Sequence, residues 1–152
     1  MNMEYPTNIE PSEMRIGVVG AGSWGTALAH LLSTKGFAVD LWVFEAEIAE
    51  QIRETRENRV FLPGVRLPEN LVPSNDIEQV VAGKPLVLVV VPSHVMRQTA
   101  GRLAECLDAR SIVVSASKGI ENETHLTMSG VLRQVIPSLC SDRIAVLSGP
   151  SF

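Results

Sequence analysis

Short apolar runs alternate along the chain with longer segments typical of amphipathic helices. The apolar runs predict strands at residues 14–20, 37–44, 71–74, 85–91, 111–116 and 144–147. The longer segments predict helices at residues 24–35, 46–57, 77–82, 94–106 and 126–136, with a loop at 58–70. The run at 85–91 is apolar on both faces, as a strand covered by helices on both sides should be. This alternation predicts an α/β fold with a doubly wound, mostly parallel sheet.

Composition and charge restrict the class of protein without changing this picture. A chain of 152 residues, 45% hydrophobic and 20% charged, fits one ordinary globular domain. Its net charge of -4 leaves no basic stripe for a nucleic acid, and its longest apolar run is too short to span a bilayer. Residues 1–13 lack the basic and apolar regions of a secretory signal. Cys106 and Cys140 show no metal or redox spacing, so we expect reduced thiols and no metal site, the alternative being a pairing of the two at a distance.

A glycine-rich turn, Gly20-Ala21-Gly22-Ser23-Trp24-Gly25, follows the first predicted strand. We expect Gly20 to allow the tight turn, Gly22 to let the backbone approach a pyrophosphate, and Gly25 to let helix and strand pack together. The start of the next helix would offer free N–H groups and a partial positive charge to the phosphates. The alternative is a loop that merely contains glycines. The strand before the turn and the helix after it favour a Rossmann-type dinucleotide-binding domain.

The second predicted strand ends at Phe44 and Glu45, where such sheets bind the adenosine end of a dinucleotide. Glu45 would accept hydrogen bonds from the ribose and repel the additional phosphate of NADP, and no arginine stands beside it. NAD is therefore favoured, with NADP still possible. The alternative for Glu45 is an ordinary acidic residue in the first turn of a helix. Phe44 either stacks on adenine or packs in the core.

Two further strand ends carry polar residues. His94 follows the fourth predicted strand, and we expect a polar loop residue there rather than an acid–base group. Lys118 follows the fifth, where its ammonium group would lie over the cofactor crevice. It could there bind an anionic substrate or hydrogen-bond the reacting oxygen, the alternative being an exposed loop lysine.

An ordered series of five motifs resembles the soluble, nicotinamide-dependent glycerol-3-phosphate dehydrogenase family. The resemblance covers nearly the whole chain after residue 13. One such motif would mean little, but five in order are highly specific. The motifs are Gly20–Ala27, Asn58 with Phe61-Leu62-Pro63-Gly64, Val90–His94, Ser117-Lys118-Gly119 and Ser148–Phe152.

The resemblance implies roles for individual residues. Ser23 and Trp24 would contact the cofactor at the pyrophosphate turn, and Phe44 would contact its adenosine end. Lys118 would contact both cofactor and substrate in an electrostatic role, while Gly149 and Ser151 would help hold glycerol 3-phosphate. Bacterial members often carry a basic residue where Phe44 stands, so Phe44-Glu45 resembles the NAD-using eukaryotic branch.

The resemblance also implies a domain organisation and an activity. Residues 1–13 would be a flexible tail and residues 14–152 the NAD(P)-binding domain. The general-base lysine, most of the substrate phosphate site and much of the dimer contact would belong to a C-terminal helical domain that these residues do not include. The complete enzyme would be a cytoplasmic homodimer that interconverts dihydroxyacetone phosphate and sn-glycerol 3-phosphate, feeding glycerophospholipid synthesis. This chain alone would bind nucleotide without useful turnover.

Two alternatives to this function remain open. The chain could be a stand-alone NAD(P)-sensing module, because the catalytic half is missing from it. It could also belong to a related β-hydroxyacid or ketopantoate-type reductase with the same cofactor fold.

Overall fold

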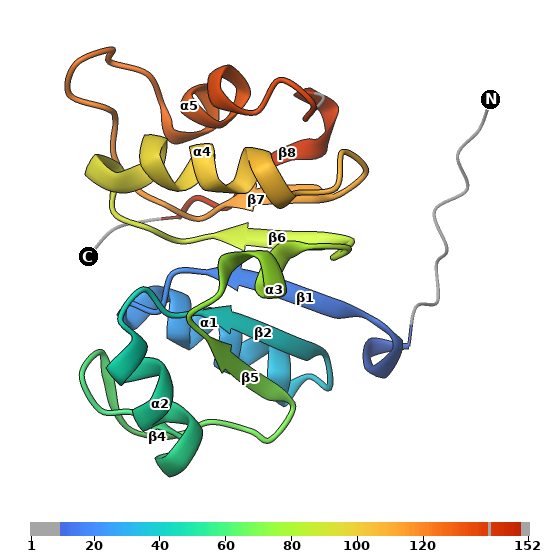
Figure 1. Ribbon diagram of the computed structural model, residues 1–152, viewed down its shortest axis with the longest axis vertical. Helices are drawn as coiled ribbons and strands as arrows, with labels where there is room; N and C mark the ends of the chain where they lie inside the picture. The colour runs from blue at the N-terminus through green and yellow to red at the C-terminus, as the bar shows by residue number, and fades with distance from the viewer. Residues whose placement is uncertain (1–9, 140, 150–152) are drawn as a thin grey trace.

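A six-stranded parallel sheet forms the centre of the fold (Figure 1). The computed structural model describes residues 10–139 and 141–149. Neighbouring strands are parallel throughout the sheet, which confirms the predicted fold class. The first and fourth strands of the sheet are adjacent, and in this arrangement ligands bind where the strand order reverses. The strands lie in the order β5 (Leu71–Ser74), β2 (Ala38–Trp42), β1 (Arg15–Val19), β6 (Leu86–Val89), β7 (Ile112–Ser115) and β8 (Ile144–Val146).

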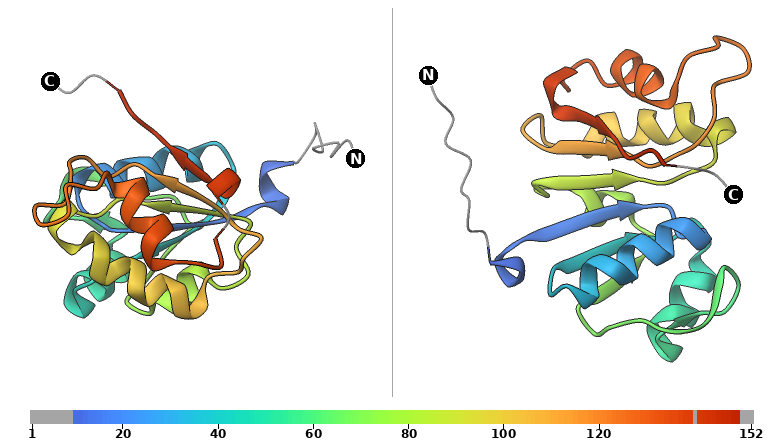
Figure 2. Two further views of the ribbon diagram at one scale, coloured as in Figure 1. Left: turned by 90° about the horizontal axis from the view of Figure 1, so that it is seen from above. Right: turned by 180° about the vertical axis from the view of Figure 1, so that it is seen from behind.

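Helices cover both faces of the sheet and create two hydrophobic cores (Figure 2). One core lies under α1 (Ser23–Thr34) and α2 (Ala46–Thr55), and the other lies under α3 (Ile77–Val81), α4 (Met96–Cys106) and α5 (Met128–Val135). Successive strand residues point to opposite faces, so Val18 packs into the first core and Val19 into the second. Both sides of β6 are buried in the same way, as its continuous apolar sequence predicts.

Most predicted elements are found within a few residues of their expected bounds. The strand predicted at 71–74 coincides with β5. The helix predicted at 77–82 is α3, and the Asp76 side chain caps it by accepting hydrogen bonds from the N–H groups of Glu78 and Gln79 at 3.0 and 3.4 Å. Between β6 and α4, Ser93–Val95 form a short 3-10 turn.

The prediction of a loop at residues 58–70 is wrong for part of that segment. β3 (Glu57–Asn58) and β4 (Leu62–Arg66) form an antiparallel hairpin whose register shifts between Glu57 and Asn58. A strand of two residues is too short to show alternation, and β4 contains Pro63 and Gly64, which are uncommon in strands. The local sequence therefore carries no strand pattern.

A short 3-10 turn precedes β1. Pro11–Glu13, which the sequence assigns to the tail, form a 3-10 turn whose Pro11 carbonyl accepts a hydrogen bond from the Met14 N–H at 3.2 Å. Residues 1–9 lie outside the described residues. Within the described part of the chain, no helix is long and apolar enough to cross a membrane.

Candidate functional site

The turn between β1 and α1 is built so closely that side chains are excluded from two of its glycine positions. Gly20 has a φ of +116°, and a β-carbon there would lie 2.2 Å from the Val90 carbonyl oxygen. A β-carbon on Gly25 would lie 1.9 Å from the carbonyl oxygen of Gly20. These distances agree with the predicted roles of Gly20 in the tight turn and Gly25 in helix–strand packing.

Gly22 differs from the other two glycines because a β-carbon there would have no described atom within 4 Å. Its φ of -67° is also ordinary, so nothing inside the described protein requires glycine at this position. The space beside Gly22 is instead open to the solvent-facing groove. Glycine leaves this space free, as expected where a ligand lies against the backbone, and any side chain here would occupy it.

The N-terminus of α1 faces the same groove. Gly22 is its N-cap, no side chain within the described residues caps it, and its first turn contains no acidic residue. Ser23 and Trp24 begin the helix and are exposed, Trp24 by 50%. N–H groups at a helix start, together with the helix dipole, favour an anionic ligand such as a pyrophosphate.

Two cavities meet at this turn along the carboxyl edge of the sheet. The smaller has a volume of about 290 Å³ and lies toward the end of β2, and the larger has about 1170 Å³ and lies toward β7 and β8. Both are lined by Gly22, Val90, Val91 and Pro92. Together the two cavities make up a groove, and the residues they share belong to the glycine turn and the end of β6. Two cavities that adjoin at such a turn fit a dinucleotide, whose two nucleoside halves are joined by a pyrophosphate.

The smaller cavity contains both residues predicted at the adenosine end, Phe44 and Glu45. Phe44 is 66% exposed, so it does not pack in the core. Its ring meets Trp42 edge to face, with a centroid distance of 5.9 Å. Phe44 is therefore an aromatic wall of the cavity, in a position where a flat base can pack against it.

Phe61 and Arg102 are among the residues of this cavity that the sequence did not predict as site residues. Phe61 is carried by the β3–β4 hairpin and was noted only as part of a family motif. Arg102 lies on α4 with its guanidinium over the Trp42 ring, 5.0 Å from the centroid. No local pattern could identify Arg102, since its position depends on how α4 packs against β2.

The larger cavity contains most of the other predicted site residues that the structure describes, whereas Gly20 lines the smaller one. Ser23, Trp24, Lys118 and Gly149 all line it, while Ser151 lies outside the described residues. The structure thus brings Lys118 and Gly149, at the ends of β7 and β8, to the same side of the glycine turn. His94 is exposed and lines neither of the two cavities formed by the described residues.

Ser117 fixes the chain immediately before Lys118. Its hydroxyl accepts a hydrogen bond from the Val91 N–H at 2.9 Å and donates to the Val89 carbonyl oxygen at 3.2 Å. These two contacts join the end of β7 to the end of β6 and so determine where the Lys118 loop leaves the sheet.

The far side of this loop is held by an ion pair. The Arg97 guanidinium donates two hydrogen bonds to the Glu121 carboxylate, at 2.8 and 2.7 Å, and a third to the Gln134 side chain at 2.7 Å. The bonds from Arg97 and then from Thr124 lower the pKa of Glu121 from 4.5 to about 2. The loop between β7 and α5 is therefore attached to both α4 and α5.

No three His, Cys, Asp or Glu side chains in the described part of the chain are arranged to hold a metal ion. Cys106 has a free thiol, and burial raises its pKa, which disfavours the reactive thiolate. Cys140 lies outside the described residues.

Comparison with known proteins identifies the relatives of this chain. The family model described as NAD-dependent glycerol-3-phosphate dehydrogenase N-terminus matches residues 15–152. The glycerol-3-phosphate dehydrogenase (NAD(P)+) of Syntrophobacter fumaroxidans is 53% identical over 137 residues, which are 90% of this chain and 40% of that protein. The enzyme of the same name from Geobacter sulfurreducens is 49% identical over 138 residues, which are 91% of this chain and 41% of that protein.

A solved structure gives the same result. The crystal structure of glycerol-3-phosphate dehydrogenase from Coxiella burnetii matches with a TM-score of 0.83 and 32% identity, covering 91% of this chain and 42% of that one. The chain thus spans about 40% of the length of the curated relatives it matches. The chain belongs to the NAD-dependent glycerol-3-phosphate dehydrogenase family and corresponds to its N-terminal domain.

Proposed function

We propose that this chain is the cofactor-binding half of an enzyme that interconverts dihydroxyacetone phosphate and sn-glycerol 3-phosphate by hydride transfer with NAD(P)(H). The observation that carries the proposal is the open backbone at Gly22, which lines both cavities at the start of α1. Membership of the family supports this reaction over that of a β-hydroxyacid or ketopantoate-type reductase. We also propose a homodimeric, cytoplasmic complete enzyme with a small-molecule substrate, as the resemblance implies.

In this proposal each part of the groove holds one part of the cofactor. The adenosine end lies in the smaller cavity against Phe44, with Glu45 accepting hydrogen bonds from the ribose. The pyrophosphate lies against Gly22 and the N–H groups at Ser23 and Trp24. The nicotinamide ring, which carries the hydride when bound, lies in the larger cavity.

Lys118 and Gly149 give the larger cavity its proposed role in binding substrate. The Lys118 ammonium would attract the phosphorylated substrate and stabilise negative charge on the oxygen at C2 as that carbon changes between alcohol and ketone. Gly149 has no described atom within 4 Å of a β-carbon position, which leaves room for a ligand beside its backbone. Ser151 remains a predicted substrate contact from the family motif.

We propose NAD as the preferred cofactor, with NADP as a weaker ligand. Glu45 lines the smaller cavity and would repel a phosphate on the ribose. Arg102 lines the same cavity, and its positive charge would attract that phosphate, which leaves NADP binding possible. The predicted preference therefore depends on Glu45 lying nearer to the ribose than Arg102 does.

Calorimetric titration of this chain with NADH and NADPH tests the proposal. We expect saturable binding of NADH with a smaller Kd than that of NADPH, and competition by ADP-ribose. Tighter NADPH binding would overturn the cofactor preference, and binding of neither nucleotide would contradict a cofactor-binding function.

Assaying the polypeptide of the complete reading frame tests the reaction. Oxidation of NADH that depends on dihydroxyacetone phosphate is the expected result. Nucleotide binding without this turnover would instead favour the sensing module.

A further inference from the structure

We propose that Asn58 is a positioning residue that holds the hairpin wall of the smaller cavity in register with the glycine turn. Its role would be to keep the adenosine-binding part of the groove assembled, without contacting the ligand itself. The inference rests on the proposed dinucleotide binding, because it assigns the adenosine half of the cofactor to this cavity.

Asn58 is a buried link between two segments that are distant in the sequence. Its side-chain Nδ2 donates hydrogen bonds to the Ala21 carbonyl oxygen and to the Thr26 Oγ1, both at 2.9 Å. Its Oδ1 accepts a hydrogen bond from the Phe61 N–H at 3.1 Å. Both ends of the amide are thus used, and Asn58 itself is 0% exposed. A buried amide with its hydrogen bonds satisfied strongly restricts the geometry around it.

The two segments joined by Asn58 both line the smaller cavity. Ala21 belongs to the glycine turn and Phe61 to the β3–β4 hairpin, and each forms part of the cavity lining. Asn58 does not line the cavity but lies behind it. The Thr26 hydroxyl extends the link, since it donates to the Ala21 carbonyl oxygen at 3.1 Å. A change at Asn58 would therefore alter the position of the hairpin relative to the glycine turn.

The hairpin needs such anchoring because its own pairing is small. β3 has 2 residues and β4 has 5, with a shift in register between them. A two-stranded hairpin of this kind is marginal without contacts to the rest of the protein. The position of Phe61 is consequently determined by side-chain contacts more than by the strand ladder.

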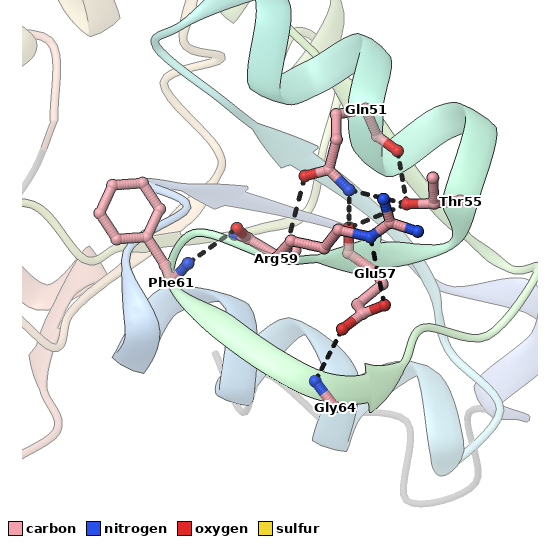
Figure 3. Close-up of polar contacts among 7 residues, drawn as sticks. Gln51, Thr55, Glu57, Arg59, Phe61 and Gly64 are labelled. Atoms are coloured by element: carbon pink, nitrogen blue, oxygen red, sulfur yellow. Dashed lines mark hydrogen bonds and ion pairs between the residues drawn. The ribbon is translucent and has the colours of Figure 1, made fainter.

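A second set of contacts holds the hairpin against α2 (Figure 3). Gln51 Nε2 donates to the Glu57 carbonyl oxygen at 2.8 Å and to the Thr55 hydroxyl at 2.7 Å. The Glu57 carboxylate accepts a hydrogen bond from the Gly64 N–H at 2.7 Å, which ties β3 to β4. These contacts fix the hairpin to α2, whereas those of Asn58 fix it to the nucleotide turn.

Ligand fragments can test this role, because only the adenosine half should depend on Asn58. The variants are Asn58→Leu, which keeps the approximate size without the amide, and Thr26→Val, which removes only the hydroxyl of the link. Thr26→Ser keeps that hydroxyl and serves as the conservative rescue. Ser33→Ala is the matched control, since Ser33 is also buried on α1 but its hydroxyl bonds to Ala29 within the helix.

The measurement is the Kd of ADP-ribose and of reduced nicotinamide mononucleotide for this chain, by calorimetry, with circular dichroism and thermal unfolding as checks of folding. We expect Asn58→Leu to weaken ADP-ribose binding about tenfold and Thr26→Val about threefold, as loss of buried hydrogen bonds would. Binding of the nicotinamide mononucleotide should stay within about twofold in both. Thr26→Ser and Ser33→Ala should bind both ligands like the unchanged chain.

The outcomes separate this inference from the proposed function. If the unchanged chain binds ADP-ribose and the folded Asn58→Leu and Thr26→Val chains bind it equally well, Asn58 is not a positioning residue although the cofactor site stands. Equally weakened binding of ADP-ribose and of the nicotinamide mononucleotide would also overturn the inference about Asn58. Should Asn58→Leu fail to fold, the comparison of Thr26→Val with Thr26→Ser decides. A lack of any nucleotide binding by the unchanged chain would overturn the proposed function and this inference together.

Discussion

The guanidinium of Arg102 lies over the indole of Trp42, with its central carbon 5.0 Å from the ring centroid. The contact joins α4 to the end of β2 and adds a cation to the cavity that also contains Phe44 and Glu45. Trp42 is itself only 4% exposed, and its Nε1 donates to the Asn75 carbonyl oxygen at 3.1 Å. Arg102 therefore rests on a fixed surface, where the attraction of its charge to the aromatic face stabilises its position.

The first prediction concerns the charges of this cavity. Glu45→Gln should improve binding of NADPH relative to NADH by about three- to fivefold, because it removes the carboxylate that repels the 2′-phosphate. Arg102→Gln should change the same ratio in the opposite direction by a similar factor. The measurement is the ratio of the two Kd values by calorimetry. Arg133→Gln, at an exposed arginine on α5, is the control. A ratio that moves equally in the control would show that only the net charge matters.

The second prediction compares two glycines of the same turn. Gly22→Ala should leave thermal stability nearly unchanged, since a β-carbon there meets no described atom within 4 Å, but should weaken NADH binding about tenfold or more. Gly25→Ala should destabilise the fold by about 3 kcal/mol, the upper end of the usual cost of overpacking, because the added carbon would lie 1.9 Å from the Gly20 oxygen. Thermal unfolding and NADH titration distinguish them. A Gly22→Ala chain that binds NADH normally would remove Gly22 from the pyrophosphate site.

The third prediction assigns Lys118 to the chemical step rather than to cofactor affinity. In the polypeptide of the complete reading frame, Lys118→Ala should lower kcat about a hundredfold, the size of effect seen when one charge-stabilising donor is removed. The Kd of NADH should change by about threefold or less. Lys35→Ala is the control, at an exposed lysine beyond the other end of α1. Unchanged turnover in Lys118→Ala would exclude this lysine from the mechanism.

The fourth prediction concerns the ion pair that anchors the Lys118 loop. The pKa of Glu121 is lowered from 4.5 to about 2 in the folded protein, so its stabilising effect is present above the unfolded pKa and is lost as pH falls through the folded value. Glu121→Gln should reduce stability to urea at pH 7, and its difference from the unchanged chain should shrink between about pH 4.5 and pH 2. Urea midpoints measured across this range check it. Glu123→Gln, which removes the same charge from the same loop, is the control for net charge.

The sheet could be predicted because each of its strands has a local signal. β6 is an apolar run bounded by polar or turn residues, and β5 begins with the apolar pair Leu71-Val72. Asp76 marks the start of α3 by a capping bond that depends only on neighbouring residues. The glycine turn likewise has a recognisable spacing of its three glycines. Its position at the carboxyl edge of the sheet could be predicted because a strand is predicted before it and a helix after it.

The missed roles of Asn58 and Arg102 depend on contacts between distant parts of the chain. Asn58 was visible as part of a motif, but its bond to Ala21 spans 37 positions of sequence. Arg102 enters the smaller cavity only because α4 packs beside Trp42. The sequence left open whether Phe44 packs in the core, because a residue just past a strand end has no fixed facing. Its 66% exposure excludes the core alternative.

The central position of β1 has a consequence for how the domain folds. β1 pairs with β2, which is near in sequence, and also with β6, which lies some 70 positions further along, as in the pairing of Ile16 with Leu86. Pairings of high contact order form late, because a long loop must close before they gain any contact energy. Val90 follows β6 and its carbonyl lies against Gly20, so we expect the glycine turn to be complete only once β6 has joined the sheet. We therefore expect a nucleotide to bind only chains in which the sheet is complete. A nucleotide added during refolding should then stabilise the native domain and increase the fraction of chains that reach it.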